Sequence, residues 1–189
     1  MGQRIIFLDN DCVICLQNNW GKRDKLMKEY LKEHPGTPMK DIPPSHRFDG
    51  FDKKAVKVLN RILLFTGAEI VVSSDWKLHA SLEELQEYYL AQGIAKSPIA
   101  VTPNMSDFDP DSCGLFQWKG WLSRIRVTEI RKYLEEHPEV TNWIAIDDLP
   151  MHLDGLENFF LTDDMGREGI KKSGLADKII KSLNESNIQ

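Results

Sequence analysis

Three short apolar runs, each followed directly by polar residues, dominate the hydrophobic pattern of the chain. The runs are Ile5–Leu8, Ile70–Val72 and Trp143–Ile146. Short continuous runs rich in β-branched and aromatic residues are typical of strands buried on both faces. Weaker strands are expected at Ser97–Val101 and Asn158–Thr162. The pattern therefore predicts a sheet with three buried strands and two weaker ones.

The segments between these strands carry apolar residues at helical spacing. Asp52 is a suitable N-cap for the first strong helix, and Ser81 with Glu84 forms a capping box that opens another. Helices are predicted at 52–67, 81–93, 123–137 and 176–183. Strands that alternate with helices predict an α/β fold, with a mostly parallel, Rossmann-like sheet and helices on both faces.

One stretch departs from this alternation. Residues 14–51 begin with irregular helix-like spacing, interrupted by Gly21, and continue through the proline-containing stretch 35–44. Repeated prolines exclude a regular helix or a central strand there. The stretch is too short for a core of its own, so we predict a single domain over residues 1–189 with a small flap-like insert at about 14–51.

Polar residues follow each of the three buried strands. They are Asp9 and Asp11 after the first, Ser73 and Ser74 after the second, and Asp147 and Asp148 after the third. Right-handed crossovers bring the carboxyl ends of parallel strands to one edge of the sheet, where open α/β sheets bind their ligands. We therefore expect these six residues to converge.

Each residue of this predicted site has a chemical use. Asp9 is a candidate nucleophile, because a carboxylate can attack phosphorus and form an aspartyl-phosphate. Asp11 can protonate the leaving oxygen and later deprotonate a water molecule. Ser73 can hold a phosphoryl oxygen. Asp147 and Asp148 can complete the oxygen shell of Mg²⁺, which would also relieve the repulsion between the carboxylates.

A cation is still needed beside the phosphoryl group, and three residues are candidates. Arg124 and Arg126 lie near the start of the helix predicted before the third strand, and Lys119 lies shortly before it. An arginine would serve only as fixed positive charge and hydrogen-bond donor, since it does not lose its proton. The residues alone leave this choice open.

These motifs resemble those of a known superfamily. Asp-x-Asp-x-Val at 9–13, Ser73 after its strand, a basic residue near 126 and Ile146-Asp147-Asp148 resemble the four motifs of the haloacid dehalogenase (HAD) superfamily. Ser73-Ser74-Asp75-Trp76 and Arg126-Val127-Thr128-Glu129-Ile130 are similar to the small HAD domains associated with Swiss Army Knife RNA-repair proteins. Cys12 departs from the pattern, because such proteins commonly have glycine there.

The resemblance implies a role for each residue. Asp9 is implied as nucleophile and metal ligand, and Asp11 as general acid/base that also binds Mg²⁺ through its backbone carbonyl. Ser73 and Arg126 complete the implied catalytic set. The predicted phosphate-binding residues are Ser73, Ser74, Arg126 and Asn10, and the predicted metal ligands are Asp9, Asp11, Asp147 and Asp148.

The expected function is a Mg²⁺-dependent phosphatase that acts through an aspartyl-phosphate on a phosphorylated substrate. A phosphoprotein, a nucleotide and a nucleic-acid end all remain possible substrates. One alternative is a metal-dependent nuclease, in which the same carboxylates hold metal ions and water attacks directly. The other alternative is a catalytically idle HAD-like scaffold that only binds.

Composition and hydropathy limit the partners and the cellular compartment that we expect. The chain has 189 residues, of which 41% are hydrophobic, and a net charge of −5, which is ordinary for a globular protein and gives no general attraction to nucleic acid. No stretch approaches the roughly 18 apolar residues of a membrane span, and no signal-peptide core follows Met1. We expect a cytoplasmic protein without a membrane partner, and the oligomeric state is left open.

Several other conspicuous patterns in the sequence indicate structural roles rather than functional sites. They are Cys12 and Cys15 with the lone Cys113, the acidic loop with Asp107, Asp109 and Asp111, the indoles of Trp118 and Trp121, and the basic cluster Lys22, Arg23, Lys25 and Lys28. Three cysteines fall short of a four-ligand zinc site, and the acidic loop lacks the spacing of a calcium loop. The basic cluster is expected to be a solvated helix face, and the indoles are expected to pack.

Overall fold

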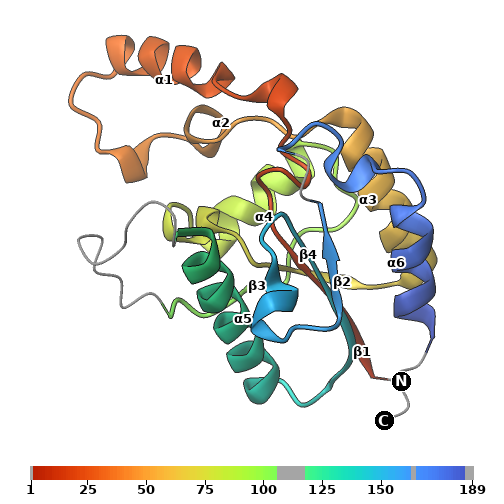
Figure 1. The fold of residues 1–189 in the computed structure, drawn as a ribbon. Coiled ribbons are helices and arrows are strands. Elements are labelled where there is room, and N and C mark those ends of the chain that lie inside the picture. The colour runs from red at the N-terminus through yellow and green to blue at the C-terminus, as the bar shows by residue number, and fades with distance from the viewer. Residues whose placement is uncertain (1, 106–117, 163–164, 186–189) are drawn as a thin grey trace.

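The structure is a computed structural model that describes residues 2–105, 118–162 and 165–185, and the side chains of residues 118 and 119 are outside the description (Figure 1). Its centre is a parallel five-stranded sheet with the strand order β3-β2-β1-β4-β5. The strands are β1 (Gln3–Leu8), β2 (Glu69–Val72), β3 (Ala100–Val101), β4 (Val140–Asp147) and β5 (Phe159–Leu161). The predicted α/β, Rossmann-like fold is confirmed.

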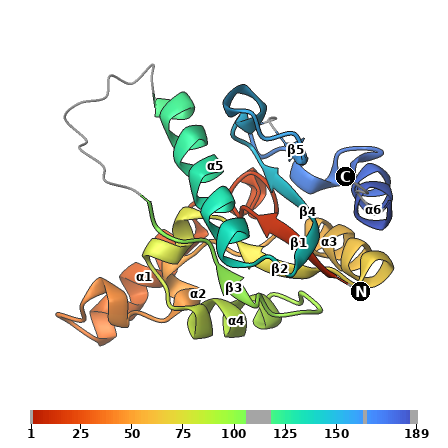
Figure 2. The same cartoon turned by 90° about the horizontal axis from the view of Figure 1, so that it is seen from below.

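Helices cover both faces of this sheet. The α-helices are α1 (Lys22–Glu33), α2 (Pro44–Arg47), α3 (Lys53–Thr66), α4 (Leu82–Ala91), α5 (Trp118–Glu136) and α6 (Leu175–Asn184). Figure 2 shows α5 on one side of the sheet and α3 with α6 on the other. Ile6 and Leu8 of β1 point into the core under α3, α4 and α6, whereas Ile5 and Phe7 point towards α5. Among the described helices, none combines the length and hydrophobicity of a membrane span.

The caps form as predicted for two helices. The Asp52 side chain accepts hydrogen bonds from the backbone N–H groups of Lys54 and Ala55 at the start of α3. Ser81 and Glu84 form a reciprocal capping box at the start of α4. The predicted start of α5 at Ser123 is wrong, because the helix begins at Trp118 and carries Ser123 as a fully buried interior residue. A serine that points into a packed face is not available for capping.

The stretch 14–51 contains four short helical elements, namely η1 (Gln17–Asn19), α1, η2 (Met39–Asp41) and α2. In Figure 1, α1 and α2 project beyond the end of the sheet. No residue of α1 is buried, whereas Leu16 and Phe48 belong to the main core. The segment is therefore anchored at both ends and exposed in its middle.

Backbone hydrogen bonds extend the sheet by one residue beyond its strands. The N–H groups of Asp9, Ser73, Thr102 and Thr162 each donate to a carbonyl of the neighbouring strand, at 2.9 to 3.0 Å. These four positions therefore form a row along the carboxyl edge of the sheet. We call them the strand-end row, and they place Asp9 next to Ser73 through main-chain geometry alone.

Candidate active site

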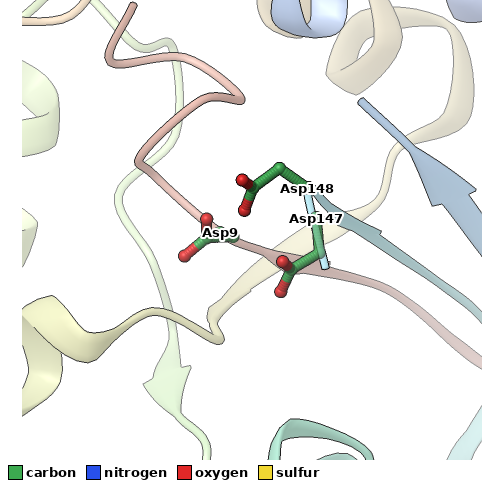
Figure 3. A group of neighbouring side chains, drawn as sticks. All are labelled: Asp9, Asp147 and Asp148. Carbon is green, nitrogen blue, oxygen red and sulfur yellow. The ribbon is translucent and has the colours of Figure 1, made fainter. Parts of the chain in front are cut away.

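Three carboxylates gather at the carboxyl ends of β1 and β4. Asp9, Asp147 and Asp148 each offer one oxygen, and these oxygens all lie within 4.8 Å of one another (Figure 3). Asp9 and Asp147 are buried, and Asp148 is half-buried. The structure thus brings together three of the four predicted metal ligands. Among the described residues, the carboxylate of Asp11 lies outside this group.

Arg126 of α5 neutralises part of this charge. Its Nη1 donates to Asp9 Oδ1 at 3.3 Å and lies 3.7 Å from Asp147 Oδ2, and its Nη2 donates to Asp75 Oδ1 at 3.0 Å. Arg124, in contrast, is exposed and pairs with Asp154. The side chain of Lys119 lies outside the described residues. Of the two arginines, Arg126 is therefore the one at the carboxylates.

Burial makes the ionised forms of Asp9 and Asp147 unfavourable, and Arg126 offsets this only in part. Burial, followed by the nearby charge of Asp147, raises the pKa of Asp9 well above its usual range. Burial also raises the pKa of Asp147 to about 7, although Arg126 opposes the shift. Asp147 Oδ1 accepts from the N–H of Leu149 at 2.9 Å, whereas its buried Oδ2 has no hydrogen-bond partner among the described residues. A buried carboxylate oxygen without a partner is costly, and a hard cation would satisfy it.

A tight turn follows Asp9 and presents Asp11. The backbone carbonyl of Asn10 accepts N–H groups from Val13, Ile14 and Cys15, and Cys12 adopts a left-handed φ of 58°. This conformation explains why glycine would suit position 12, and a non-glycine residue is strained there. The turn separates Asp11 from the three carboxylates and points it towards a different partner.

That partner is Trp76, whose Nε1 donates to Asp11 Oδ2 at 2.9 Å. Protein atoms packed around the carboxylate raise the pKa of Asp11 by desolvation, although the residue as a whole is exposed, and the bond from Trp76 opposes the shift. A raised pKa favours the protonated form, which a proton donor requires. The geometry thus suits Asp11 for proton transfer rather than for metal binding through its carboxylate.

The predicted phosphate-binding residues divide into two groups. Ser73 and Ser74 are buried, and their hydroxyls have no hydrogen-bond partner among the described residues. Ser73 lies next to Asp9 in the strand-end row, so its hydroxyl is available for a phosphoryl oxygen. Asn10 is fully buried, and its Oδ1 accepts from the hydroxyl of Tyr89 in the core. Its Nδ2 is the atom that could donate to a phosphoryl oxygen, and it has no hydrogen-bond partner among the described residues.

The sequence reasoning missed a buried ion pair behind Arg126. Lys77 Nζ donates to Glu129 and also to Thr102 Oγ1 at 2.8 Å, and both charged side chains are only 4% exposed. Glu129 lies one helical turn after Arg126. Together with the contact between Arg126 and Asp75, the pair ties α5 to η3 (Asp75–Leu78) at two points. The sequence shows that Arg126 and Glu129 lie one helical turn apart and so share a helix face, but it does not show that Lys77 is the partner of Glu129.

The turn that carries Asp11 rests on a segment near the C-terminus. Ile170 donates its N–H to the carbonyl of Val13 at 3.0 Å. Gly169 has a φ of +55°, and a Cβ there would lie 2.4 Å from that same carbonyl oxygen. Only glycine accommodates both the conformation and the approach. The sequence contains this glycine, but nothing in the local pattern distinguishes it from a loop glycine.

The remaining patterns show no second metal site in the described part of the chain, where the three carboxylates are the only group that meets the geometry. Cys12 and Cys15 are free thiols. Burial, followed by the charge of Asp148, raises the pKa of Cys12 to about 12, which disfavours a reactive thiolate. Cys113 and the acidic loop fall outside the described residues, as does the side chain of Trp118, and Trp121 is half-buried.

Comparison with known proteins gives one match. A family model described as the HAD domain in Swiss Army Knife RNA repair proteins matches residues 5–172, which is most of the chain. No curated protein and no solved structure matches it significantly. The matched range includes every residue of the candidate active site.

Proposed function

Because the chain belongs to the family of HAD domains found in Swiss Army Knife RNA repair proteins, we propose that it is a Mg²⁺-dependent phosphatase that acts through an aspartyl-phosphate on Asp9. The family supports a phosphatase-like hydrolase. One observation supports the finer proposal: the Asp9 carboxylate lies among a guanidinium, the buried Ser73 hydroxyl and the buried Oδ2 of Asp147, and the last two have no hydrogen-bond partner among the described residues.

The carboxylates fit a magnesium ion. Asp9, Asp147 and Asp148 offer hard oxygen donors in close proximity, and the unsatisfied Oδ2 of Asp147 would gain a ligand bond. When bound, Mg²⁺ would offset the negative charge of the three carboxylates and of the phosphoryl group. The raised pKa of Asp9 supports this requirement, because a nucleophile must be ionised and nearby positive charge would lower that pKa.

In the proposed first step, an oxygen of Asp9 attacks phosphorus, and the bond between phosphorus and the ester oxygen breaks. Asp11 donates its proton to that leaving oxygen, so an alcohol departs and Asp9 is left as an acyl phosphate. In the second step, Asp11 takes a proton from a water molecule as the water attacks phosphorus. The bond between phosphorus and the Asp9 oxygen breaks, inorganic phosphate leaves, Asp9 is again a carboxylate and Asp11 is again protonated.

The other residues hold the phosphoryl group during both steps. The hydroxyls of Ser73 and Ser74, which have no hydrogen-bond partner among the described residues, would donate to phosphoryl oxygens. Arg126 supplies a fixed positive charge next to Asp9. Trp76 orients Asp11 through its indole N–H. Asp75 and the ion pair of Lys77 with Glu129 hold Arg126 and its helix in position.

Substrate class is the open part of the proposal. The family description favours the phosphate at an RNA end as the first substrate to test, with nucleotides and phosphoproteins next. The decisive experiment measures phosphate release from phosphorylated oligonucleotides, nucleotides, phosphopeptides and sugar phosphates, each with Mg²⁺ and with EDTA. We expect release only with Mg²⁺.

Variants then test the covalent step. Asp9→Asn should abolish turnover without unfolding the protein, and Asp11→Asn should slow both the formation and the hydrolysis of the acyl phosphate. Asp177→Asn is the matched control, because this carboxylate is exposed and pairs with Arg61 away from the site. Beryllofluoride should bind Asp9 and inhibit. Turnover without any covalent intermediate would favour the nuclease alternative, and no turnover on any substrate would favour the idle scaffold.

A further inference from the structure

A cavity of about 370 Å³ opens beside Asp11, and the residues that line it do not include Asp9, Asp147 or Asp148. Its walls come from four parts of the chain: the turn after β1, the residues around the start of α1, Asp49 after α2, and the element η3. Trp20, Arg23 and Trp76 line it together with Asp11. The volume lies in the range of small-ligand sites in proteins.

The position of this cavity relative to the proton donor identifies what enters it. In the proposed reaction, Asp11 protonates the oxygen of the group that leaves phosphorus. That group must therefore lie within hydrogen-bond reach of Asp11 while the phosphoryl group lies at Asp9. Since Asp11 lines the cavity, the leaving group occupies it.

Two indoles make the cavity suited to a flat ring. Trp76 is 5% exposed, and its ring stacks on Phe48 at 4.2 Å between centroids, so it is held rigidly. Trp20 is 44% exposed, which is unusual for so large an apolar side chain. Its Nε1 donates to the carbonyl of Cys15 at 3.4 Å, and its ring packs on Gly166, so its orientation is fixed as well. A rigid exposed indole beside a reacting group is a stacking surface for an aromatic ring.

α1 supplies the cation that further phosphates on such a ring would contact, since Arg23 is the one basic residue among those that line the cavity. Five of the twelve residues of α1 are lysine or arginine and three are acidic. Arg23 faces the cavity, as does Asp24. The Nε of Arg23 lies 3.9 Å from Asp24 and 3.9 Å from Asp49, distances at which an ion pair is weak, and its Nη1 donates to the carbonyl of Arg47 at 3.2 Å. Asp49 also lines the cavity, but both its oxygens already accept backbone N–H groups from Gly21 and Arg23. Phosphate oxygens can therefore compete for Arg23.

We propose that this cavity binds the nucleoside part of a nucleotide leaving group, with its base stacked on Trp20 and an adjacent phosphate on Arg23. The inference rests on the phosphatase function proposed above and names its substrate class. An alkyl leaving group, such as that of a phosphoserine peptide, has no ring that could stack on the indole of Trp20. The basic α1 is expected to follow the strand of an oligonucleotide and to add little for a mononucleotide.

The test compares kcat/KM for a 3′-phosphorylated and a 5′-phosphorylated pentanucleotide, a mononucleotide, a phosphoserine peptide and glycerol 2-phosphate. We expect Trp20→Ala to lower the ratio of nucleotide to glycerol phosphate kcat/KM by roughly 5- to 100-fold, which is the range of one base stack. Trp20→Phe should keep most of the ratio. Phe65→Ala removes another exposed aromatic, on α3, and should change neither value. Arg23→Gln should lower kcat/KM for the pentanucleotides more than for the mononucleotide.

A second arm separates this inference from the phosphatase proposal. Binding of a fluorescent phosphorylated pentanucleotide is measured on Asp9→Asn, with and without Trp20→Ala, so that no turnover is needed. If no substrate is hydrolysed but binding depends on Trp20, the cavity inference holds and the phosphatase proposal fails. The cavity inference is overturned if turnover occurs but Trp20→Ala leaves the ratio of nucleotide to glycerol phosphate kcat/KM unchanged. It is also overturned if the phosphopeptide is the better substrate. If Arg23→Gln lowers kcat/KM by the same factor for the pentanucleotides and the mononucleotide, the cavity binds mononucleotides and the placement of a further phosphate on Arg23 is wrong.

Discussion

Replacing Asp147 by asparagine should make the protein more stable in the absence of divalent metal. Asp147 is 1% exposed, and its ionised form is surrounded by other carboxylates. Asparagine has nearly the same shape and keeps an oxygen for the N–H of Leu149. The substitution therefore removes a buried negative charge while leaving the packing in place.

The magnitude follows from the pKa of about 7 against the ordinary value of 3.8. A shift of about three units corresponds to about 4 kcal/mol at 1.36 kcal/mol per unit, which is the upper limit of the gain at pH 8. Relaxation of the site around the charge reduces this, and we expect about 2 kcal/mol, or about 4 to 8 °C in Tm for a chain of this size.

The sign of the pH dependence is also defined. The folded pKa of Asp147 is raised, so the folded state binds the proton more tightly than the unfolded state does. Wild-type stability is therefore lost as pH rises from about 4 to about 7, and the advantage of Asp147→Asn should grow over the same interval. Below pH 4 the two proteins should differ little.

Urea unfolding in EDTA at pH 5 and pH 8 measures the difference in unfolding free energy between wild type and Asp147→Asn. The same unfolding experiment is then repeated with increasing Mg²⁺. Mg²⁺ should raise the midpoint of the wild type and have little effect on Asp147→Asn. Ser81→Ala is the control: it removes the exposed cap of α4 and should cost about 1 kcal/mol with or without metal. If Asp147→Asn is less stable than wild type at pH 8 in EDTA, the attraction of Arg126 outweighs the cost of burial and the reasoning is refuted.

Three further predictions concern the supports of the site. Gly169→Ala should destabilise the protein by about 2 kcal/mol or more, because its Cβ would collide with the carbonyl of Val13 at a positive φ; an unchanged Tm would contradict this. Glu129→Gln should cost about 3 kcal/mol by leaving Lys77 buried and unpaired, and the double variant with Lys77→Met should recover most of the loss in a double-mutant cycle. Cys12 should react with iodoacetamide at pH 7.5 about a thousandfold more slowly than an ordinary thiol, and rapid labelling of the folded protein would disprove the raised pKa.

The convergence of the site was predictable because it depends on strand ends. Apolar runs mark buried strands, and parallel topology then brings Asp9, Ser73 and Asp147 to one edge whatever the intervening sequence. The choice between Arg124 and Arg126 was within reach of helical periodicity. Arg126 lies one turn before the buried Ile130, whereas Arg124 lies on the opposite, solvent-facing side of α5.

Other parts of the site were not readable from the sequence. The pairing of Lys77 with Glu129 joins residues 52 positions apart and depends on how α5 packs on η3. The need for Gly169 depends on a carbonyl from the other end of the chain. The turn of Asp11 towards Trp76 results from the backbone of residues 10–15, which local residue preferences do not specify. Such features arise only once distant segments are packed together.

The strand-end row has a consequence for how this site can change. Its positions are held by main-chain hydrogen bonds that any residue except proline can make. A new side chain at position 9, 73 or 162 would therefore appear beside the same neighbours, on a platform that does not depend on it for its shape. Directed evolution of new chemistry should begin with combinatorial libraries at these positions, with Thr102 kept for its contact with Lys77. Because main-chain hydrogen bonds determine where these side chains lie, the same fold can carry different catalytic residues at its strand ends.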